Sequence, residues 1–356
     1  MVRLSVVVPM FNAERFVSHA FEVLDRQGLD RADFEVIVVD DGSSDATAAL
    51  VEGCAEVRGN VVVLHQENAG AGVARNRGMD AAQGRYLYFF DVDDDLDDGA
   101  LRILLEHCER DDLDILFFGG RLRYEPAECE SDYYQDPRYF ERRQASGVVD
   151  GEDMFIRQSA DGNFCAQPCL LMTKLETMRS QGIRFAEGIV NEDNLFVLQA
   201  TLRSRRVDVD PALRYTYVVR PNTVTTDNRT GGKRFLAHMV LAQEFELERQ
   251  RAIACGKDRL AEAIGAIIIW FMGIIEENCP EPVEEFKPFS DPRFSELAMA
   301  ARFVQQDVRG LRSIREERER AERAEARVVE LEASTTWRVG RAVTALPRAL
   351  KRALSR

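Results

Sequence analysis

The first hundred residues alternate between short apolar runs and longer stretches with helical spacing. Four runs rich in β-branched and aromatic residues are predicted to be strands: Leu4–Val8, Glu35–Val39, Val61–Leu64 and Tyr86–Phe90. Strands that are apolar throughout and separated by helices are typical of a parallel sheet with helices on both faces. Right-handed crossovers bring the carboxyl ends of such strands to one edge, where open α/β sheets bind ligands. The chain is therefore predicted to be an α/β protein with a binding site at that edge.

Polar and glycine-rich clusters follow three of the predicted strands, so the fold would gather them at the same edge. They are Asp40-Asp41-Gly42-Ser43, Gly70-Ala71-Gly72 and the acidic run from Asp91 to Asp95. Carboxylates this close repel one another unless a cation or solvent relieves the repulsion. Mg²⁺ and Mn²⁺ prefer oxygen ligands and keep positions for water and substrate phosphates. The acidic run thus predicts a site for a divalent cation and a diphosphate, with a plain acidic turn as the alternative.

The cluster Gly70-Ala71-Gly72 superficially resembles a dinucleotide-binding fingerprint, but two features argue against one. Arg75 stands where the third glycine is required, and the cluster follows the third strand rather than the first. A helix that begins here could instead present its N-terminus to a phosphate, with Arg75 as the counter-charge. Asp40 could accept a hydrogen bond from a base or a ribose, although Asp41 or Ser43 in the same cluster also fits a helix N-cap.

Composition excludes several classes of protein. A net charge of −14 argues against a general nucleic-acid-binding protein, which needs a basic surface to neutralise phosphates. The seven cysteines form no C-x-x-C pair, which is typical of incidental thiols in a reducing compartment. A strand follows Met1 directly, without the features of a signal peptide. The longest later apolar run, Ile264–Ile275, falls well short of the roughly 20 residues that span a bilayer, so it is predicted to be a core helix in a cytoplasmic protein.

The middle of the chain is predicted to continue as mixed α/β structure to about residue 225. Residues 121–150 are charged and poorly periodic, and they are interpreted as a loop-rich insertion. Asn191 is predicted to cap a helix that runs to Arg203, because acidic residues follow it in the first turn. A strand is predicted at Arg214–Val219, shortly before Arg220.

The last third of the chain is predicted to be helical and then strongly charged. Residues 226–308 are predicted to be helical, with a proline-rich interruption at Cys279–Pro288. Residues 309–333 are dense in Glu and Arg and carry apolar residues at heptad-like spacing. They are predicted to form either a solvated single helix or a short coiled coil through which the chain forms a homo-oligomer.

An ordered series of motifs in the first 225 residues resembles the family-2 glycosyltransferases of the GT-A fold. The series consists of Val6–Asn12, Val38–Asp45, Glu67–Gly70 with Ala74–Gly78, Gly84–Tyr86 and Phe90–Asp94. Glu187-Gly188 followed by Glu192-Asp193 resembles the acceptor-side element of bacterial cell-surface polysaccharide members. The resemblance implies a three-layer GT-A sandwich over residues 1–225 with a mostly parallel sheet, and the C-terminal helical extension lies outside it. The donor half would span about 1–118 and the acceptor half about 119–225.

The resemblance also implies an activity and a set of site residues. The activity is an inverting transfer of a sugar from a nucleotide donor, with a UDP-sugar favoured, to a glycan or a lipid-linked acceptor. Asp193 would be the general base with Glu192 beside it, and Asp93, Asp91 and Asp94 would hold a Mn²⁺ or Mg²⁺ ion. Asp40 would contact the base. The residues expected to bind the nucleotide sugar are Pro9, Phe11, Asn12, Asp40, Asp41, Asn68, Arg75, Asp91, Val92, Asp93 and Arg220.

Two other functions fit parts of the sequence. Phe89 to Asp93 mimics the strand and D-x-D motif of a class of phosphatases with a nucleophilic aspartate. That motif belongs on the first strand of such a domain, whereas three β–α units precede it here. A catalytically silent nucleotide-binding scaffold is the second alternative, and the presence of Asp91, Asp93 and Asp193 together argues against it.

The sequence ends in a basic amphipathic tail. Residues 334–356 contain six basic residues and no acidic residue, and Trp337 lies among further apolar side chains. Such a segment suits the anionic inner face of the plasma membrane, at roughly 1 kcal/mol for each basic residue near the headgroups. Packing of the tail on the protein's own acidic surface is the alternative.

Deletion of residues 334–356 is therefore expected to release the protein from anionic liposomes in a co-sedimentation assay. Liposomes of neutral lipid are the control, because they lack the charge that attracts basic side chains. Equal binding of the complete and the truncated chain to anionic liposomes would contradict the membrane interpretation.

Overall fold

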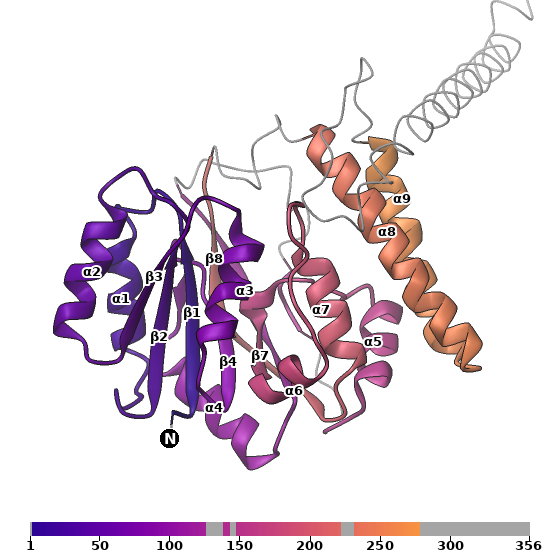
Figure 1. Ribbon diagram of the computed structural model, residues 1–356. Coiled ribbons are helices and arrows are strands. Elements are labelled where there is room, and N and C mark those ends of the chain that lie inside the picture. Colours follow the sequence, from indigo (N-terminus) through magenta and orange to yellow (C-terminus); the bar gives the residue numbers. More distant parts are fainter. Residues whose placement is uncertain (1, 126–137, 143–146, 222–230, 278–356) are drawn as a thin grey trace, which may run out of the picture. The chain divides into compact units, whose positions relative to one another are not determined.

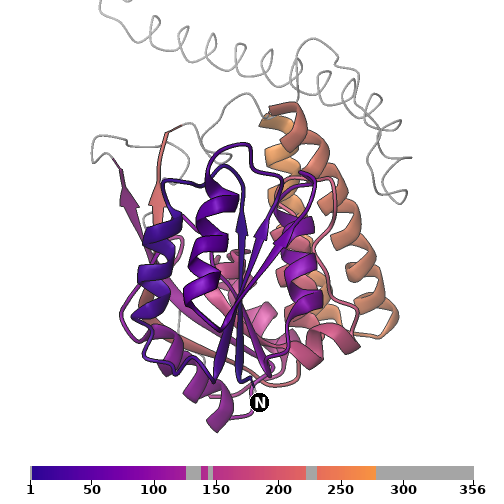
Figure 2. The ribbon, with the colours of Figure 1, turned by 60° about the vertical axis from the view of Figure 1, so that its left-hand side comes forward.

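The computed structural model describes residues 2–125, 138–142, 147–221 and 231–277, which lie around one eight-stranded sheet (Figures 1 and 2). The strand order is β3-β2-β1-β4-β7-β6-β8-β5. The four predicted strands are confirmed, and they are parallel neighbours at one side of this sheet. They are β1 (Leu4–Met10), β2 (Phe34–Asp40), β3 (Val61–His65) and β4 (Tyr86–Phe89).

Three helices connect these parallel strands, as the helical spacing predicts: α1 (Val17–Asp25), α2 (Thr47–Val57) and α3 (Ala71–Ala81). Helix α3 approaches the sheet closely, since a Cβ atom at Gly78 would lie 2.3 Å from Val7 Cγ1. The contact holds the start of α3 over the carboxyl edge of the strands. This edge carries the three polar clusters.

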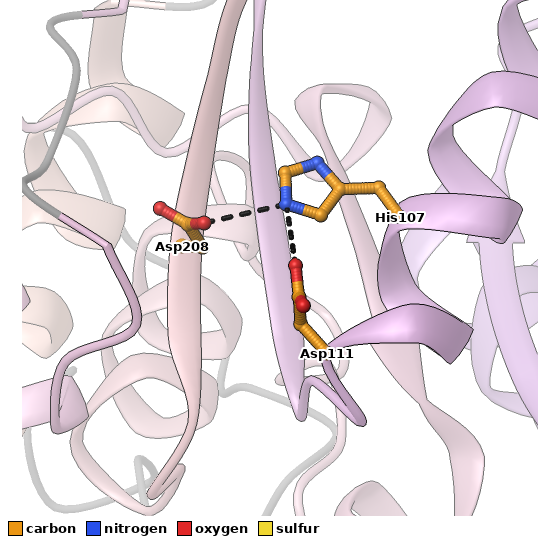
Figure 3. Close-up of side chains that lie close together, drawn as sticks. All are labelled: His107, Asp111 and Asp208. Carbon is orange, nitrogen blue, oxygen red and sulfur yellow. Dashed lines mark hydrogen bonds and ion pairs between the residues drawn. The ribbon is translucent and has the colours of Figure 1, made fainter.

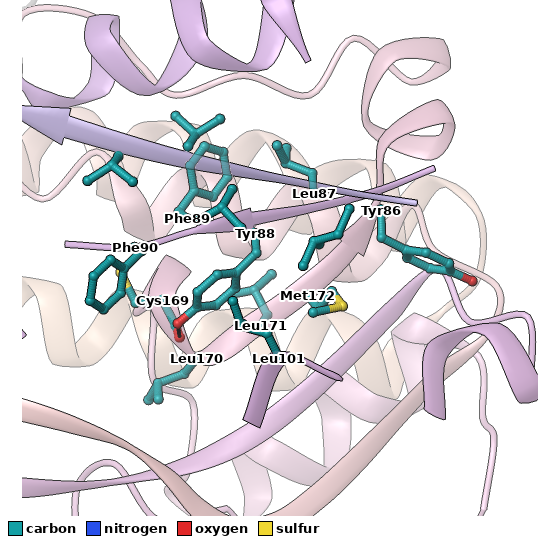
Figure 4. Close-up of a cluster of buried hydrophobic side chains, with 14 of the residues drawn as sticks. Tyr86, Leu87, Tyr88, Phe89, Phe90, Leu101, Cys169, Leu170, Leu171 and Met172 are labelled. Carbon is teal, nitrogen blue, oxygen red and sulfur yellow. Dashed lines mark hydrogen bonds between the residues drawn. The ribbon is translucent and has the colours of Figure 1, made fainter. Parts of the chain in front are cut away.

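The interior below this edge is filled by the side chains of β4 and its neighbours (Figure 4). All four residues of β4 are buried, and the two tyrosine hydroxyls among them donate hydrogen bonds to main-chain oxygens. Tyr86 donates to Cys108 O at 2.8 Å, and Tyr88 donates to Cys169 O at 2.9 Å. Buried hydroxyls that are paired in this way cost little, so the strand forms a rigid base for the acidic run that follows it.

The second half of the sheet mixes strand directions. Strand β7 (Leu171–Lys174) is antiparallel to both β4 and β6, whereas β6 (Ile115–Tyr124) and β8 (Val207–Val219) are parallel. The two-residue strand β5 (Asp95–Leu96) is antiparallel to β8, and α4 (Ala100–Arg110) follows it. The first half of the sheet is thus parallel and the second half is mixed, with helices packed against it.

Two strands are longer than the sequence pattern predicts. Residues 121–124, which are interpreted above as the start of a loop-rich insertion, continue β6, and β8 begins seven residues before the predicted Arg214. The reason is mutual pairing, because Arg121 to Tyr124 align with Thr216 to Val219. The sequence does not reveal this pairing, because an exposed strand with many charged side chains has a composition similar to that of a loop.

The remaining described helices are α5 (Gly151–Ala160), α6 (Leu175–Ser180), α7 (Asp193–Leu202), α8 (Gly231–Ala254) and α9 (Asp258–Glu277), with a short 3₁₀ turn at Pro168–Leu170.

The predicted side-chain cap by Asn191 is wrong. Asn191 adopts a left-handed conformation with φ 59°, and its main-chain oxygen, not its side chain, accepts a hydrogen bond from the Asn194 amide at 3.2 Å. Glu192 is the residue that directly precedes the helix.

Helices α8 and α9 lie side by side, and α9 also contacts α5 (Figure 1). The chain turns between them at Gly256, with φ 70°, a break that the sequence analysis does not predict. The apolar run Ile264–Ile275 is buried on one side only, which corrects its interpretation as a core helix. On the outward side Ile269, Trp270 and Met272 are 75%, 49% and 48% exposed. None of the described helices combines the length and the apolar character needed to cross a membrane.

The predictions for residues 278–356 fall outside the described residues. They include the interruption at Cys279–Pro288, the charged helix or coiled coil at 309–333 and the basic tail. The domain boundaries proposed at residues 225 and 308 likewise stay predictions.

Candidate active site

The acidic run after β4 carries its charge in four different environments. Asp91 Oδ1 accepts a hydrogen bond from Arg75 Nη2 at 2.9 Å. Arg220 Nη1 donates to the main-chain oxygen of Asp93 at 2.7 Å and lies 3.5 Å from its Oδ2. Asp95 contacts Arg123 at 2.6 Å and the ring of His19 at 2.7 Å. Cationic side chains of the protein therefore relieve much of the repulsion among these carboxylates. The sequence analysis predicts a divalent cation for that purpose.

Asp94 points into the protein, which corrects its prediction as a metal ligand. One carboxylate oxygen accepts a hydrogen bond from the Val218 amide at 2.8 Å, and the other accepts one from the Tyr215 hydroxyl. Burial, and then the charges of Asp93 and Asp91, raise the pKa of Asp94 well above its usual range. The side chain thus joins the acidic run to the end of β8, which positions Arg220 beside Asp93.

Arg75 forms the link between the two sides of the edge. It extends from α3, is buried, and donates from Nη2 to Asp91 and from Nη1 to Glu192 Oε1, each at 2.9 Å. Its guanidinium carbon lies 5.4 Å from the centre of the Phe185 ring. Burial opposes the charge, but Asp91 and Glu192 outweigh it, so the pKa of Arg75 is raised. Arg75 therefore forms ion pairs with two carboxylates of the protein, whereas the sequence analysis predicts that it binds a phosphate.

Glu192 and Asp193 begin α7 beside this arginine. A Cβ atom at Gly72 would lie 2.9 Å from Glu192 Cγ, so α3 and the start of α7 are in close contact. Asp193 Oδ1 accepts hydrogen bonds from the Asn194 amide at 3.0 Å and from the Asn194 side chain at 3.3 Å. Burial and the charge of Glu192 raise the pKa of Asp193 to about 7, although Arg75 opposes the shift. A carboxylate with this pKa can take up a proton near neutral pH.

A second group of predicted residues lies at the ends of β1 and β2. Asp41 accepts hydrogen bonds from the Ala69 amide at 2.9 Å and the Gly70 amide at 2.8 Å, so it fixes the loop before α3. Asn12 Oδ1 accepts a hydrogen bond from the Ser44 amide at 2.8 Å and joins the two strand ends. Both side chains are thus used within the protein, where the sequence analysis predicts contacts to the nucleotide.

The other predicted residues of this group differ in how they face solvent. Asp40 is buried, and its carboxylate contacts Ser43 and His65. The ring of Phe11 is 51% exposed and Asn68 is exposed, whereas Pro9 is only half-buried in β1. Val92 is almost fully buried beneath the acidic run. Phe11 is therefore the large apolar surface that this end of the edge offers to a ligand.

Sequence reasoning does not find several residues that shape the edge. His65 contacts Asp40 at 3.1 Å, Phe185 lies against Arg75, and Tyr215 lies behind Asp94. Phe185 and Tyr215 belong to segments about 110 to 120 positions away from their partners, so no local pattern marks them. His65 is the exception, because it ends the strand next to the one that Asp40 ends.

The only metal-like cluster in the described part of the chain lies elsewhere. His107, Asp111 and Asp208 offer ligand atoms within 4.8 Å of one another (Figure 3). His107 Nε2 lies 3.3 Å from a carboxylate oxygen of each aspartate, and Arg110 also binds Asp111 at 2.6 Å. Asp208 belongs to the start of β8, whereas the other end of this strand lies beside the acidic run. Contacts of the histidine ring with the two aspartates account for this cluster.

The acidic run still fits a divalent ion, through two residues rather than three. The side chains of Asp91 and Asp93 are 22% and 34% exposed, and both face Arg75 or Arg220 from the same edge. Mg²⁺ and Mn²⁺ commonly use one or two carboxylates and take their remaining oxygens from water and substrate phosphates. Asp91 and Asp93 are thus suited to such an ion when a diphosphate supplies the other ligands.

Comparison with known proteins gives concordant results. Residues 5–159 match the family model described as glycosyl transferase family 2. The uncharacterized glycosyltransferase EpsJ of Bacillus subtilis is 29% identical over 231 residues, which span 62% of this chain and 62% of EpsJ. More than a third of each protein therefore lies outside the match.

Two solved structures share the fold. S. aureus TarS 1-349 in complex with UDP-GlcNAc superposes with a TM-score of 0.61 at 20% identity, over 87% of this chain and 88% of that one. The mannosyltransferase PcManGT from Pyrobaculum calidifontis, in complex with GDP-Man and Mn²⁺, gives a TM-score of 0.52 at 17% identity, over 87% and 82%.

The carboxylate pair predicts opposite effects of two conservative substitutions on stability. An aspartate in an unfolded chain has a pKa of about 3.9, and Asp193 has one of about 7 in the folded protein. The folded state holds this proton more tightly, so ionisation of Asp193 lowers stability as the pH rises from about 4 to about 7. Asp193→Asn should therefore raise the free energy of unfolding at pH 8, on the order of 1–3 kcal/mol, and the gain should shrink as the pH falls towards 4.

Glu192→Gln is the matched comparison, and it should lower stability at pH 8. It removes one of the two carboxylates that balance buried Arg75, at a cost on the order of 2 kcal/mol. Urea unfolding of both variants between pH 5 and pH 8 measures these changes. An Asp193→Asn variant no more stable than the wild type at pH 8 would contradict the environment described for Asp193.

Proposed function

We propose that this chain, whose residues 5–159 match the glycosyl transferase family 2 model, moves a sugar from a nucleotide donor to a hydroxyl group of a glycan or lipid-linked acceptor. The donor is a UDP-sugar, the transfer inverts the anomeric carbon, and the product belongs to a cell-surface polysaccharide. The observation that carries the proposal is the bridge from Asp91 through Arg75 to Glu192. It connects the acidic end of a parallel strand to Glu192, and the next residue, Asp193, is the carboxylate whose pKa is raised to about 7.

The nucleotide lies along the ends of β1, β2 and β4 in this proposal. Phe11 offers an exposed ring on which the base can stack, beside Pro9, and Asp40 offers a carboxylate to a base N–H group. The UDP-GlcNAc complex of TarS, which shares the fold, supports a uridine nucleotide as the donor class. Asn12 and Asp41 shape this region through their hydrogen bonds to neighbouring loops.

The diphosphate lies next to Asp91 and Asp93, which would hold a divalent ion on it. Such an ion stabilises the charge that develops on the departing diphosphate. The Mn²⁺ and GDP-Man complex of PcManGT supports an ion in this role. Arg220 is the cation that we assign to the diphosphate, because its partners Asp93 and Glu125 are partly exposed at the end of β8. Arg75, in contrast, is buried between Asp91 and Glu192.

Asp193 acts as the general base. Its carboxylate takes the proton of the acceptor hydroxyl while that oxygen forms a bond to the anomeric carbon. The bond between this carbon and the diphosphate oxygen breaks on the opposite face, and its electron pair leaves with the nucleoside diphosphate. A single displacement of this kind inverts the configuration. Asp193 suits the role better than Glu192, because Glu192 is paired with Arg75 while Asp193 accepts hydrogen bonds only from Asn194 among the contacts described for it.

The phosphatase alternative is less well supported. The nucleophilic aspartate of such phosphatases belongs on the first strand of its domain, whereas Asp91 follows β4 and accepts a hydrogen bond from Arg75. The family match also covers the D-x-D region itself.

Asp193→Asn is expected to reduce transfer at least a hundredfold, because general-base catalysis contributes roughly 10²- to 10⁴-fold. UDP affinity should stay within about threefold, since the amide keeps the shape of the side chain. Asp153→Asn is the control, as Asp153 is an exposed first-turn aspartate of α5. In the wild type the turnover number should rise with pH through about 7, because the base must be ionised. A pH-independent turnover between 5.5 and 8, or an active Asp193→Asn variant, removes Asp193 from this role.

Asp93→Asn is expected to weaken UDP binding about tenfold in the presence of Mn²⁺ and to change it little in EDTA. The amide is a poorer ligand for a hard divalent ion than the carboxylate. Calorimetric titration of UDP with and without Mn²⁺ measures the effect, and Asp98→Asn, an exposed change outside the edge, is the control. If Mn²⁺ strengthens UDP binding equally in the variant and the wild type, Asp93 does not hold the ion.

A further inference from the structure

His65 lies at the base end of the edge and occupies a position that the proposed reaction does not use. It is the last residue of β3, and the parallel register aligns it with Asp40, the last residue of β2. The ring is 45% exposed while Asp40 is almost fully buried. The histidine is thus the outer member of a pair whose inner member we assign to the donor base.

Both nitrogens of the His65 ring contact carboxylates. Nδ1 lies 3.1 Å from Asp40 Oδ2, and Nε2 lies 2.8 Å from Glu52 Oε1 on α2. Arg77 on α3 donates to the main-chain oxygen of His65 at 2.6 Å. Hydrogen bonds to Glu52 and Asp40 raise the pKa of the ring, which favours the doubly protonated form with a donor on each nitrogen.

Two donors therefore fix the Asp40 carboxylate from opposite sides. The Ser43 amide donates to Oδ1 at 3.2 Å, and the His65 ring donates to Oδ2. A carboxylate has about four lone-pair positions, so positions remain for an N–H group of a base after these two bonds form. The two hydrogen bonds fix the plane of the carboxylate and therefore the direction of its remaining lone pairs. A carboxylate fixed in this way loses less conformational entropy when the base binds.

We propose that His65 is a positioning residue which orients Asp40 towards the N–H group of the donor base and thereby determines affinity and selectivity for the nucleoside diphosphate. The inference rests on the proposed function, in that Asp40 meets the base. His65 itself does not contact the reacting atoms, so its effect falls on donor binding and not on the rate of transfer.

Two substitutions separate the two contacts of the ring. The amide nitrogen of Asn takes a place close to that of histidine Nδ1, whereas the amide nitrogen of Gln lies close to that of Nε2. His65→Asn therefore keeps the bond to Asp40, and His65→Gln keeps the bond to Glu52 alone. Both remove the positive charge, so charge does not distinguish them.

His65→Asn is expected to bind UDP within about twofold of the wild type in a calorimetric titration with Mn²⁺. His65→Gln should bind UDP about five- to tenfold more weakly and lose most of its preference for UDP over CDP. The turnover number at saturating donor should be unchanged in both, with the donor KM raised only in His65→Gln. Melting temperatures alike in both variants would show that the difference is local.

Equal UDP affinity and equal UDP-to-CDP preference in the two variants would overturn the role of His65 while leaving the transferase proposal intact. A turnover number that falls in both variants would overturn it as well, because a positioning residue for the base leaves the chemical step alone. A wild-type protein that binds no uridine nucleotide overturns the proposed function, and the inference about His65 falls with it.

Discussion

The site depends on one buried guanidinium group. Arg75 touches Asp91, which follows a strand of the first half, and Glu192, which precedes a helix of the second half, each at 2.9 Å. These two carboxylates are about a hundred residues apart, and each would be costly to bury without a counter-charge. With Arg75 between them, the network of three groups is stable and the two halves of the edge have a fixed separation. The pKa of Asp193 follows from the same arrangement, since burial raises it most, the neighbouring Glu192 raises it further and Arg75 limits the rise.

This balance changes how the acidic run after β4 should be understood. Repulsion among neighbouring carboxylates by itself indicates a need for cations, and it does not say whether those cations are metal ions or arginines. Here Asp91, Asp93 and Asp95 are each close to an arginine, and Asp94 is buried and hydrogen-bonded. A divalent ion at this edge has to share Asp91 and Asp93 with cationic side chains that are already there. The affinity of the site for a divalent ion should therefore depend strongly on the phosphate oxygens of the donor, which would complete the coordination that Asp91 and Asp93 begin.

Most of the donor half of the fold could be predicted from the sequence, because its strands are apolar throughout and its helices have regular spacing. Polar clusters at the strand ends also predicted that these residues meet at one edge of the sheet. The partners of those polar groups could not be predicted: Tyr215 and Val218 lie more than 120 residues from Asp94, and Glu192 lies 117 residues from Arg75. Local patterns likewise missed the extension of β6 along β8, where charged residues hide the pairing, and the left-handed turn at Asn191 that replaces a side-chain cap. Residue types thus indicated which side chains gather at the edge, while long-range contacts determined the partner of each one.

The outward face of α9 has a practical consequence for spectroscopy. The chain has two tryptophans: Trp270 lies on that face, and Trp337 lies outside the described residues. The emission of Trp270 therefore reports the surroundings of α9 and not of Phe11, the ring on which we propose that the base stacks. An emission shift to shorter wavelength on addition of lipid vesicles would register transfer of an indole out of water without any label. Tryptophan emission can thus be used to test for lipid contact with no label attached near the acidic edge.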